Sequence, residues 1–315
     1  MFVASCPLRV SLFGGSTDNP TFIQKFGYGS VISFASNLKT YISLHQDKVG
    51  YNVYGGKYIV NYSKREEIEN INQIINDPVR VVFKYFNVEP LTVSLNSDSY
   101  SQGSGLASSS SYIISLIKAI SLYKELDLTP MEICNLAYKL ELKINPFCGF
   151  QDPYGCGIGG LKRIEFTNTN KIKYEFLETD LFNYFDAHLI FTGVTRNSKN
   201  VLADVSKNID KATPLLETLE KAYIEFKNKN YEKFLNLINV SWEQKKITSN
   251  IISSNDTIKE MDELISNNKT VIAHKLCGAG NGGFFLVFSE RNKLELSFKK
   301  VKISVDTHGV IGNTL

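Results

Sequence analysis

The sequence lacks the features that mark several large classes of protein. Its 315 residues hold 35 Lys and Arg against 32 Asp and Glu, which leaves a net charge of +3 without a long basic block. Nucleic-acid or membrane-surface binding usually needs a clustered cationic face, so we expect neither partner. No apolar run approaches the length that spans a bilayer, and no basic region precedes the first apolar residues. We therefore expect a cytoplasmic protein.

Cysteine is scarce and its spacing carries no site signature. The residues are odd in number, scattered, and form no Cys-x-x-Cys pair, so we expect neither a disulfide nor a zinc framework. They are Cys6, Cys134, Cys148, Cys156 and Cys277. Hydrophobic residues at 43% and charged residues at 21% are close to the averages of globular proteins. The length favours two domains of roughly 100–200 residues each.

Strand and helix patterns alternate along the chain. We expect strands over 41–44, 91–95, 158–166, 187–191 and 284–288, helices over 79–86 and from Ile113 onward, and mostly helix over 213–265. Thr129–Glu132 has the pattern of a capping box and opens a further helix. The polar stretch 167–173 lacks periodicity and suggests a domain boundary near it. We expect an α+β protein with domains at 1–175 and 176–315.

A cluster of small residues runs over Gly103–Ser111, directly before an expected helix. Small residues let a backbone close on a ligand, and a helix start offers unpaired N–H groups, so the arrangement suits a phosphate. No Gly-Lys-Ser/Thr follows, so this is not the Walker sequence. A flexible loop with an ordinary serine cap explains the same residues.

Two further glycine clusters lie near the ends of the chain. Gly278–Gly283 satisfies G-x-G-x-x-G, but a strand-like run follows it at once, so we expect a loop before a strand rather than a dinucleotide site. Phe13–Asp18 forms a turn whose Asp18 carboxylate suits sugar hydroxyls, although an Asp cap before Pro20 explains it equally well.

Glu141 and Asp152 form a candidate carboxylate pair. Glu141 lies on or beside the apolar stripe of its expected helix, where a carboxylate is costly unless it binds a cation or a partner. Asp152 follows after Pro146 and Gly149 have ended that helix. One acid suits Mg²⁺ and the other an acceptor hydroxyl, as phosphoryl transfer requires. A structural salt bridge plus a turn aspartate is the other interpretation.

Together and in this order, these pieces resemble the GHMP kinases, and among them the D-glycero-D-manno-heptose 7-phosphate kinases. The matching segments are Pro7–Ser11 with Phe13–Asp18, Gly103–Ser111, Gln151–Tyr154, Phe191–Arg196, Ser241-Trp242 with Lys245-Lys246, and Lys275–Phe284. Six motifs in order, over almost the whole chain, are more specific than any one of them. Ser16, Ala107 and Asn281 stand where the family has glycine, and Pro153 stands where it has glutamine.

The resemblance implies a ribosomal S5 domain 2-like N-terminal domain and a ferredoxin-like C-terminal domain, with ATP and a sugar phosphate meeting between them. It implies that Asp152 and Arg9 are catalytic and that Ser109 and Glu141 bind Mg²⁺. The implied ATP-binding residues are Gly103, Ser104, Gly105, Leu106, Ala107, Ser108, Ser109 and Ser110. The implied substrate-binding residues are Gly14, Gly15, Ser16, Thr17, Asp18, Arg196, Gly278, Ala279 and Gly280. Arg196 is the candidate for a substrate phosphate, because a guanidinium binds phosphate bidentately.

The activity implied is ATP-dependent phosphorylation of the anomeric C1 hydroxyl of D-glycero-D-manno-heptose 7-phosphate, for nucleotide-activated heptose synthesis. A kinase for another sugar, such as fucose, galactose or an octose phosphate, would keep the same chemistry. A sugar and nucleotide sensor without turnover is the alternative from a different class. The joint presence of Arg9, Ser109, Glu141 and Asp152 argues against the sensor.

Overall fold

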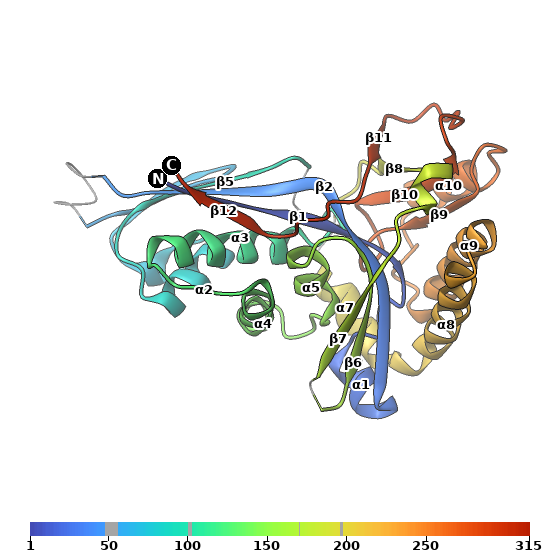
Figure 1. Cartoon of the computed structure of the whole chain (residues 1–315), viewed down its shortest axis with the longest axis horizontal. Coiled ribbons are helices and arrows are strands. Elements are labelled where there is room, and N and C mark those ends of the chain that lie inside the picture. The colour runs from blue at the N-terminus through green and yellow to red at the C-terminus, as the bar shows by residue number, and fades with distance from the viewer. Residues whose placement is uncertain (48–55, 100–102, 170, 196–197) are drawn as a thin grey trace.

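The computed structural model describes residues 1–47, 56–99, 103–169, 171–195 and 198–315 (Figure 1). Its strands are β1 (Phe2–Phe13), β2 (Tyr28–His45), β3 (Tyr58–Asn61), β4 (Arg65–Ile68), β5 (Thr92–Ser97), β6 (Leu161–Thr167), β7 (Ile172–Leu177), β8 (Phe185–Phe191), β9 (Ala273–Leu276), β10 (Phe284–Glu290), β11 (Lys300–Ile303) and β12 (Ile311–Thr314). Its α-helices are α1 (Pro20–Phe26), α2 (Asp77–Phe86), α3 (Ser108–Tyr123), α4 (Pro130–Glu141), α5 (Gln151–Gly157), α6 (Leu181–Tyr184), α7 (Ser198–Lys207), α8 (Thr213–Lys227), α9 (Tyr231–Thr248) and α10 (Asp256–Ser266). Short 3₁₀ turns lie at Ile71–Gln73 and Ile209–Ala212.

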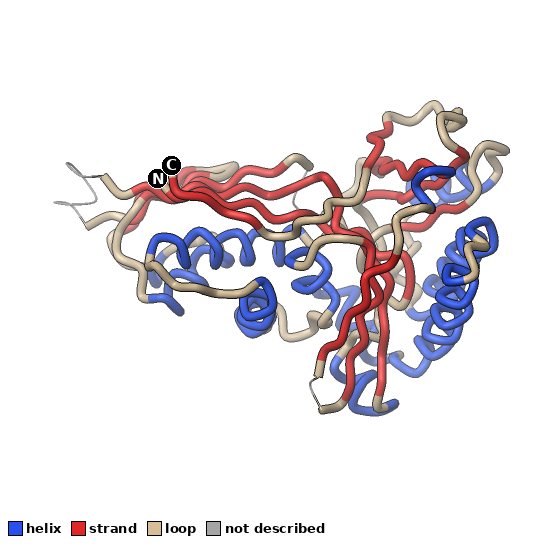
Figure 2. Tube along the Cα trace, in the orientation of Figure 1, coloured by secondary structure: helices blue, strands red, loops and turns tan. Residues whose placement is uncertain are grey.

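The first sheet is organised around the long strand β2. Its path runs β12-β1-β2-β5-β3-β4, and β6 also pairs with β2 and carries β7. The first part of β2, Tyr28–Phe34, pairs with β6, whereas Thr40–His45 pairs with β5. Figure 1 shows β2 bending between these two parts, with α2, α3, α4 and α5 on one face of the sheet. Figure 2 shows the strands of this sheet in red, running along one side of these helices.

The second sheet has the order β11-β8-β10-β9, and all its pairs are antiparallel. Its strands are almost fully buried over Phe185–Ile190 and Phe284–Ser289. One hydrophobic core joins Leu8 and Leu12 of β1 to Leu189 of β8, Phe234 of α9 and Phe288 of β10. The second sheet and α9 are therefore packed directly on β1, the strand that carries Arg9.

The expected α+β class is confirmed, and so are most expected elements. Thr129 and Glu132 form both hydrogen bonds of a capping box, and 213–265 is mostly helix. Two boundaries were wrong. The helix expected from Ile113 begins at Ser108, because Ala107 adopts a left-handed conformation that turns the chain into α3. The strand expected over 158–166 begins only at Leu161, since Gly160 has a φ of 81°.

The division of the chain into domains 1–175 and 176–315 remains a proposal. The strand pairings place Ile172–Leu177 in the first sheet, where β6 and β7 form a hairpin around the polar stretch 167–173. They also bring β12 back to β1, with Phe2 opposite Thr314. Both termini consequently lie side by side (Figure 1). In the described part of the chain, no helix is long and apolar enough to cross a membrane.

Candidate active site

A cavity of about 190 Å³ lies where β1, the turn after it, the loop before α3, the α4–α5 connection and the loop after β9 converge. Its lining includes three acidic side chains, Asp18, Glu141 and Asp152. It also includes three cationic side chains, Arg9, Lys245 and Lys275. Charged groups of both signs thus surround one small space that reaches residues from both sheets.

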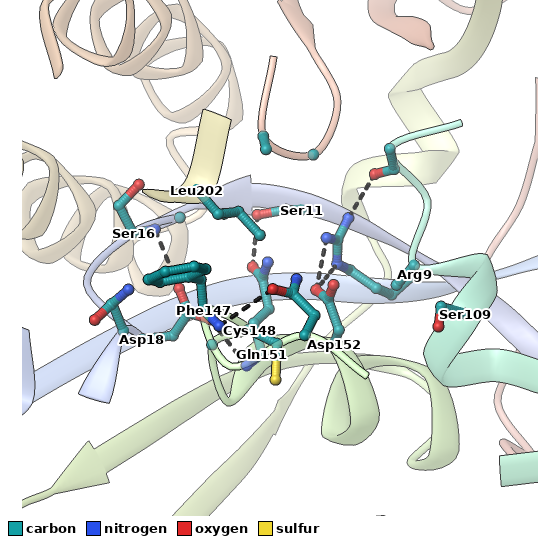
Figure 3. Close-up of a pocket in the computed structure, with 18 of the residues that line it drawn as sticks. Arg9, Ser11, Ser16, Asp18, Ser109, Phe147, Cys148, Gln151, Asp152 and Leu202 are labelled. Carbon is teal, nitrogen blue, oxygen red and sulfur yellow. Dashed lines mark hydrogen bonds and ion pairs between the residues drawn. The ribbon is translucent and has the colours of Figure 1, made fainter. Parts of the chain in front are cut away.

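Arg9 connects Asp152 to the small-residue loop before α3. Its Nε and Nη2 donate to Asp152 Oδ1 at 2.8 Å and 2.6 Å, and its Nη1 donates to the carbonyl oxygen of Gly105 at 2.8 Å (Figure 3). Burial is the largest single effect and acts to lower the pKa of Arg9, but the charge and hydrogen bond of Asp152, together with smaller contributions from Cys156 and Cys277, raise that pKa overall. Both bonds go to Oδ1, and no described residue donates to Oδ2 of Asp152. Asp152 is therefore fixed while one oxygen remains for a ligand.

The small-residue loop packs backbone to backbone against the glycine loop near the C-terminus. A Cβ added to Gly105 would lie 2.5 Å from the carbonyl oxygen of Cys277, and one added to Gly283 would lie 2.3 Å from that of Ser104. Both glycines also have positive φ, at 77° and 96°. Only glycine tolerates this combination of approach and backbone conformation. The loops that open α3 and follow β9 form one wall of the cavity.

Glu141 lies at the end of α4 with its side chain buried at 7% exposure. Burial, with the charge of Asp152, raises its pKa to about 7, and the hydroxyls of Ser110 and Ser109 oppose that shift. Ser110 Oγ donates to Glu141 Oε2. A carboxylate and a hydroxyl are ligands that Mg²⁺ prefers, and Mg²⁺ in kinases is commonly held by one or two carboxylates plus phosphates. The described residues contain no group of three or more His, Cys, Asp or Glu side chains placed for a metal. Glu141 with Ser109 fits the simpler arrangement.

Asp18 is held in the turn after β1 and faces the same cavity. Its Oδ1 accepts from the amide of Ser16 at 3.1 Å, and its Oδ2 accepts from the amide of Gln151 at 3.0 Å (Figure 3). Burial raises its pKa, and the bond from Gln151 opposes that effect. Phe147 projects beside it (Figure 3). A carboxylate next to an aromatic ring is a suitable surface for a polyhydroxylated ligand.

Comparison with known proteins agrees with this geometry. Residues 73–160 match the model of the GHMP kinases N terminal domain. This segment of the chain is therefore similar to the N-terminal domain of the GHMP kinases. The chain is 27% identical over 304 residues to the D-glycero-alpha-D-manno-heptose 7-phosphate kinase of Campylobacter jejuni, covering 91% of this chain and 89% of that protein. A galactokinase of Thermotoga petrophila is 20% identical over 334 residues, covering 94% of this chain and 90% of that protein, so both of these relatives are sugar kinases.

Solved GHMP kinases share its fold over nearly the whole length. A D-glycero-D-manno-heptose 1-phosphate kinase from Bacteroides thetaiotaomicron aligns with a TM-score of 0.76 at 18% identity, covering 100% of this chain and 99% of that one. The galactokinase of Lactococcus lactis complexed with galactose aligns with a TM-score of 0.74 at 17% identity, covering 98% and 94%. The expected GHMP kinase architecture is confirmed.

The structure separates the expected site residues into those that line the cavity and those that do not. Those that line the cavity are Arg9, Gly15, Ser16, Asp18, Gly103, Ser104, Gly105, Ala107, Ser108, Ser109, Glu141, Asp152, Gly278 and Ala279. Those that lie outside its lining are Gly14, Thr17, Leu106, Ser110 and Gly280. Thr17 Oγ1, for example, donates to the carbonyl oxygens of Gly14 and Ser30 and supports the turn. Arg196 lies outside the described residues.

Sequence reasoning did not select several residues that line the cavity. The polar ones are Ser11, Asn19, Asn145, Gln151, Lys245 and Lys275, and the apolar ones include Phe147, Leu202 and Val205. Ser11 Oγ donates to Gln151 Oε1 at 2.7 Å, which joins β1 to the start of α5 (Figure 3). Gln151, Lys245 and Lys275 stand inside motifs of the GHMP kinases, so the motif positions were the available signal.

The three departures from family glycines share one backbone property. Ser16, Ala107 and Asn281 have φ values of 87°, 60° and 58°, all in the region that favours glycine. Asparagine tolerates this conformation better than most residues, whereas in alanine it brings Cβ too close to the following carbonyl oxygen. At all three positions this chain therefore carries a side chain on a backbone conformation that favours glycine.

Proposed function

We propose that this chain is a GHMP kinase that transfers the γ-phosphoryl group of ATP to the anomeric C1 hydroxyl of D-glycero-D-manno-heptose 7-phosphate. The product would be the 1,7-bisphosphate, which supplies nucleotide-activated heptose synthesis. One observation carries the proposal: Asp152, fixed by Arg9 against the loop before α3, shares a cavity with the hydrogen-bonded Asp18. The similarity to the heptose 7-phosphate kinase of C. jejuni over 91% of the chain supports the choice of sugar.

Asp152 orients the acceptor hydroxyl in this proposal. Its Oδ1 is occupied by Arg9, so Oδ2 accepts the hydrogen bond from the C1 hydroxyl. Arg9 keeps the carboxylate in place and adds a fixed positive charge beside the transferred group, through its contact with Gly105. Phosphoryl transfer depends mainly on such positioning and on stabilisation of the charge on the phosphoryl oxygens.

ATP is bound by the loop before α3 and the first turn of that helix. Ser104, Gly105, Ser108 and Ser109 line the cavity there, and the amides at the start of α3 suit phosphate oxygens. Glu141 and Ser109 would hold Mg²⁺, which would supply positive charge to neutralise the phosphates. Ser110 supports this site because its hydroxyl donates to Glu141.

Asp18 binds sugar hydroxyls, and Arg196 binds the 7-phosphate. Asp18 is preorganised by the amides of Ser16 and Gln151, so little side-chain entropy is lost when a sugar binds. The role of Arg196 rests on its place in Phe191–Arg196 alone.

The test is a phosphotransfer assay with ATP and Mg²⁺ on a panel of sugars and sugar phosphates, with the product identified by ³¹P NMR. We expect turnover on heptose 7-phosphate and a new signal from a phosphate on C1. Faster turnover on an unphosphorylated hexose would replace the proposed substrate. ATP binding without transfer to any member of the panel would favour the sensor.

A further inference from the structure

Two buried lysines enter the cavity from the side of the second sheet. Lys275 on β9 is 3% exposed, and its Nζ donates to the carbonyl oxygen of Leu12 on β1 at 2.9 Å. Lys245 on α9 is 7% exposed, and its Nζ donates to the carbonyl oxygen of Gly278 at 2.5 Å. Both side chains line the same cavity as Asp152. Lys275 therefore connects β9 to β1, and Lys245 connects α9 to the loop after β9.

The charge of Lys275 is not balanced by a carboxylate in the described structure. No described acidic residue forms an ion pair with it, and its Nζ donates to a neutral carbonyl, that of Leu12. Burial lowers the pKa of Lys275 to about 8, with a smaller contribution in the same direction from the charge of Arg9. A buried ammonium is costly unless an anion or several hydrogen bonds compensate it. An anion in the cavity would supply that compensation.

A hydrogen-bonded cluster around Asp262 involves the chain neighbours of both lysines. Asp262 of α10 accepts from Lys246 at 2.9 Å and bonds His274 Nε2 at 2.8 Å. Lys246 is the chain neighbour of Lys245, and His274 is the neighbour of Lys275. One carboxylate on α10 therefore fixes α9 and β9 relative to each other, immediately next to the two lysines. The ammonium groups themselves are held by the carbonyls of Gly278 and Leu12, so they can bind an anion with little loss of side-chain entropy.

We propose that Lys245 and Lys275 together bind a phosphate group, between β1 and the loop that follows β9. The inference rests on the proposed function, because it assigns one phosphate of that reaction to these side chains. Lysine binds phosphate as a strong point charge. Asp18, Glu141 and Asp152 would repel a phosphate, and of the three cations that line the cavity Arg9 is already paired with Asp152, so we assign the phosphate to the two lysines. The γ-phosphate of ATP and the phosphate of the acceptor share this chemistry.

The experiment measures binding of matched ligand pairs to the full chain by calorimetry. The pairs are ATP against ADP, and heptose 7-phosphate against unphosphorylated heptose. We expect Lys275→Met and Lys245→Met to weaken binding of the phosphate-bearing member of one pair by about tenfold or more, with its partner little changed. Loss confined to ATP assigns the γ-phosphate, and loss confined to heptose 7-phosphate assigns the acceptor; either outcome supports the site. If the affinities for both members of each pair change equally, the proposed phosphate site is wrong.

Lys162→Met is the matched control. Lys162 is also fully buried, and its Nζ donates to the carbonyl oxygens of Gly155 and Gly159 at 3.1 Å and 3.2 Å, but it lines no part of the cavity. We expect it to lower the free energy of unfolding without changing either affinity ratio. Should a methionine variant at Lys245 or Lys275 fail to fold, Lys→Arg variants carry the test. These variants keep the positive charge, so we expect them to keep the preference for the phosphate-bearing ligand. If a folded arginine variant that still binds ADP loses this preference completely, the site requires the ammonium group of lysine.

The outcomes also separate this inference from the proposed function. Selective loss of ATP binding in the lysine variants, with no sugar phosphorylated by the unaltered protein, keeps the phosphate site and removes the proposed acceptor. Transfer to heptose 7-phosphate by the unaltered protein, with unchanged ligand ratios in both lysine variants, keeps the proposed function and removes the site.

Discussion

Gly149 lies directly against the carboxylate of Asp18. A Cβ added to Gly149 would be 2.0 Å from Asp18 Oδ2 and 2.7 Å from its Cγ. The amides of Gln151 and Ser16 hold the carboxylate from other sides, so it cannot move away without losing a hydrogen bond. The connection between α4 and α5 therefore positions the side chain that we propose for sugar binding.

This contact predicts the effect of Gly149→Ala. The methyl group should displace Asp18 and raise KM for the sugar by at least ~10-fold, because small misplacements of positioning groups are costly. KM for ATP should change little. Steady-state kinetics of the single variants and of the double variant with Asp18→Ala form the check. If the alanine acts through Asp18, it should add almost nothing in the Asp18→Ala background; additive losses would contradict this prediction.

Asp152→Asn should keep the fold and ATP binding and lower kcat by at least ~10²-fold. Asparagine retains the shape but presents a neutral amide to Arg9 and to the acceptor hydroxyl, and loss of a positioned acid–base group typically costs this much. Turnover is measured together with ATP binding and with a thermal unfolding curve. Near-normal turnover of the folded variant would remove Asp152 from the mechanism.

Glu141→Gln should weaken the dependence on Mg²⁺ more than the affinity for sugar. A neutral amide is a poorer ligand than a carboxylate for a hard divalent cation. The measurement is a Mg²⁺ titration of turnover at saturating ATP and sugar, with Ser109→Ala as a second variant at the same site. An unchanged titration for both variants would leave Glu141 with a purely structural role.

Ala107→Gly should stabilise the protein. The φ of Ala107 is 60°, a conformation that costs an alanine about 1–2 kcal/mol. The flexibility of glycine in the unfolded chain offsets about 0.4–1 kcal/mol of that gain. We expect a net increase of up to about 1 kcal/mol in the free energy of unfolding, measured in urea. The control is Ala119→Gly, inside α3, the helix that Ala107 precedes, and it should destabilise the protein. A loss of stability in Ala107→Gly would contradict the proposal that Ala107 is strained.

The burial of Lys162 predicts that the free energy of unfolding depends on pH. Burial lowers its pKa to about 8 in the folded protein, whereas an unfolded lysine has a pKa of about 10.4. Between these two values the folded state has released the proton and the unfolded state still binds it, so stability rises with pH. The rise relative to Lys162→Met should reach about 3 kcal/mol by pH 10.4, at about 1.36 kcal/mol for each unit. Urea unfolding of both proteins from pH 7 to 10.4 checks this, and parallel curves would exclude it.

The elements that could be predicted from the sequence are those set by near neighbours in the chain. The capping box at Thr129–Glu132 and the helix after Asp77-Pro78 depend on residues three or four positions apart, and both are present. The order of the glycine and carboxylate motifs was likewise sufficient to predict the fold of the GHMP kinases. In contrast, α3 begins earlier than its apolar residues suggested, because the conformation of Ala107 cannot be read from its side chain.

Contacts between distant segments were decided only by the tertiary structure. The sequence marked Arg9 and Asp152 separately, but only the packing of α5 against β1 brings them together across 143 positions. The same holds for Lys275, whose ammonium reaches Leu12 because the second sheet packs on β1. Local propensity extends over one or two turns, whereas these contacts require the burial of many apolar side chains at once. The identity of the candidate residues is therefore a property of the sequence, and their arrangement around one cavity is a property of the packed core.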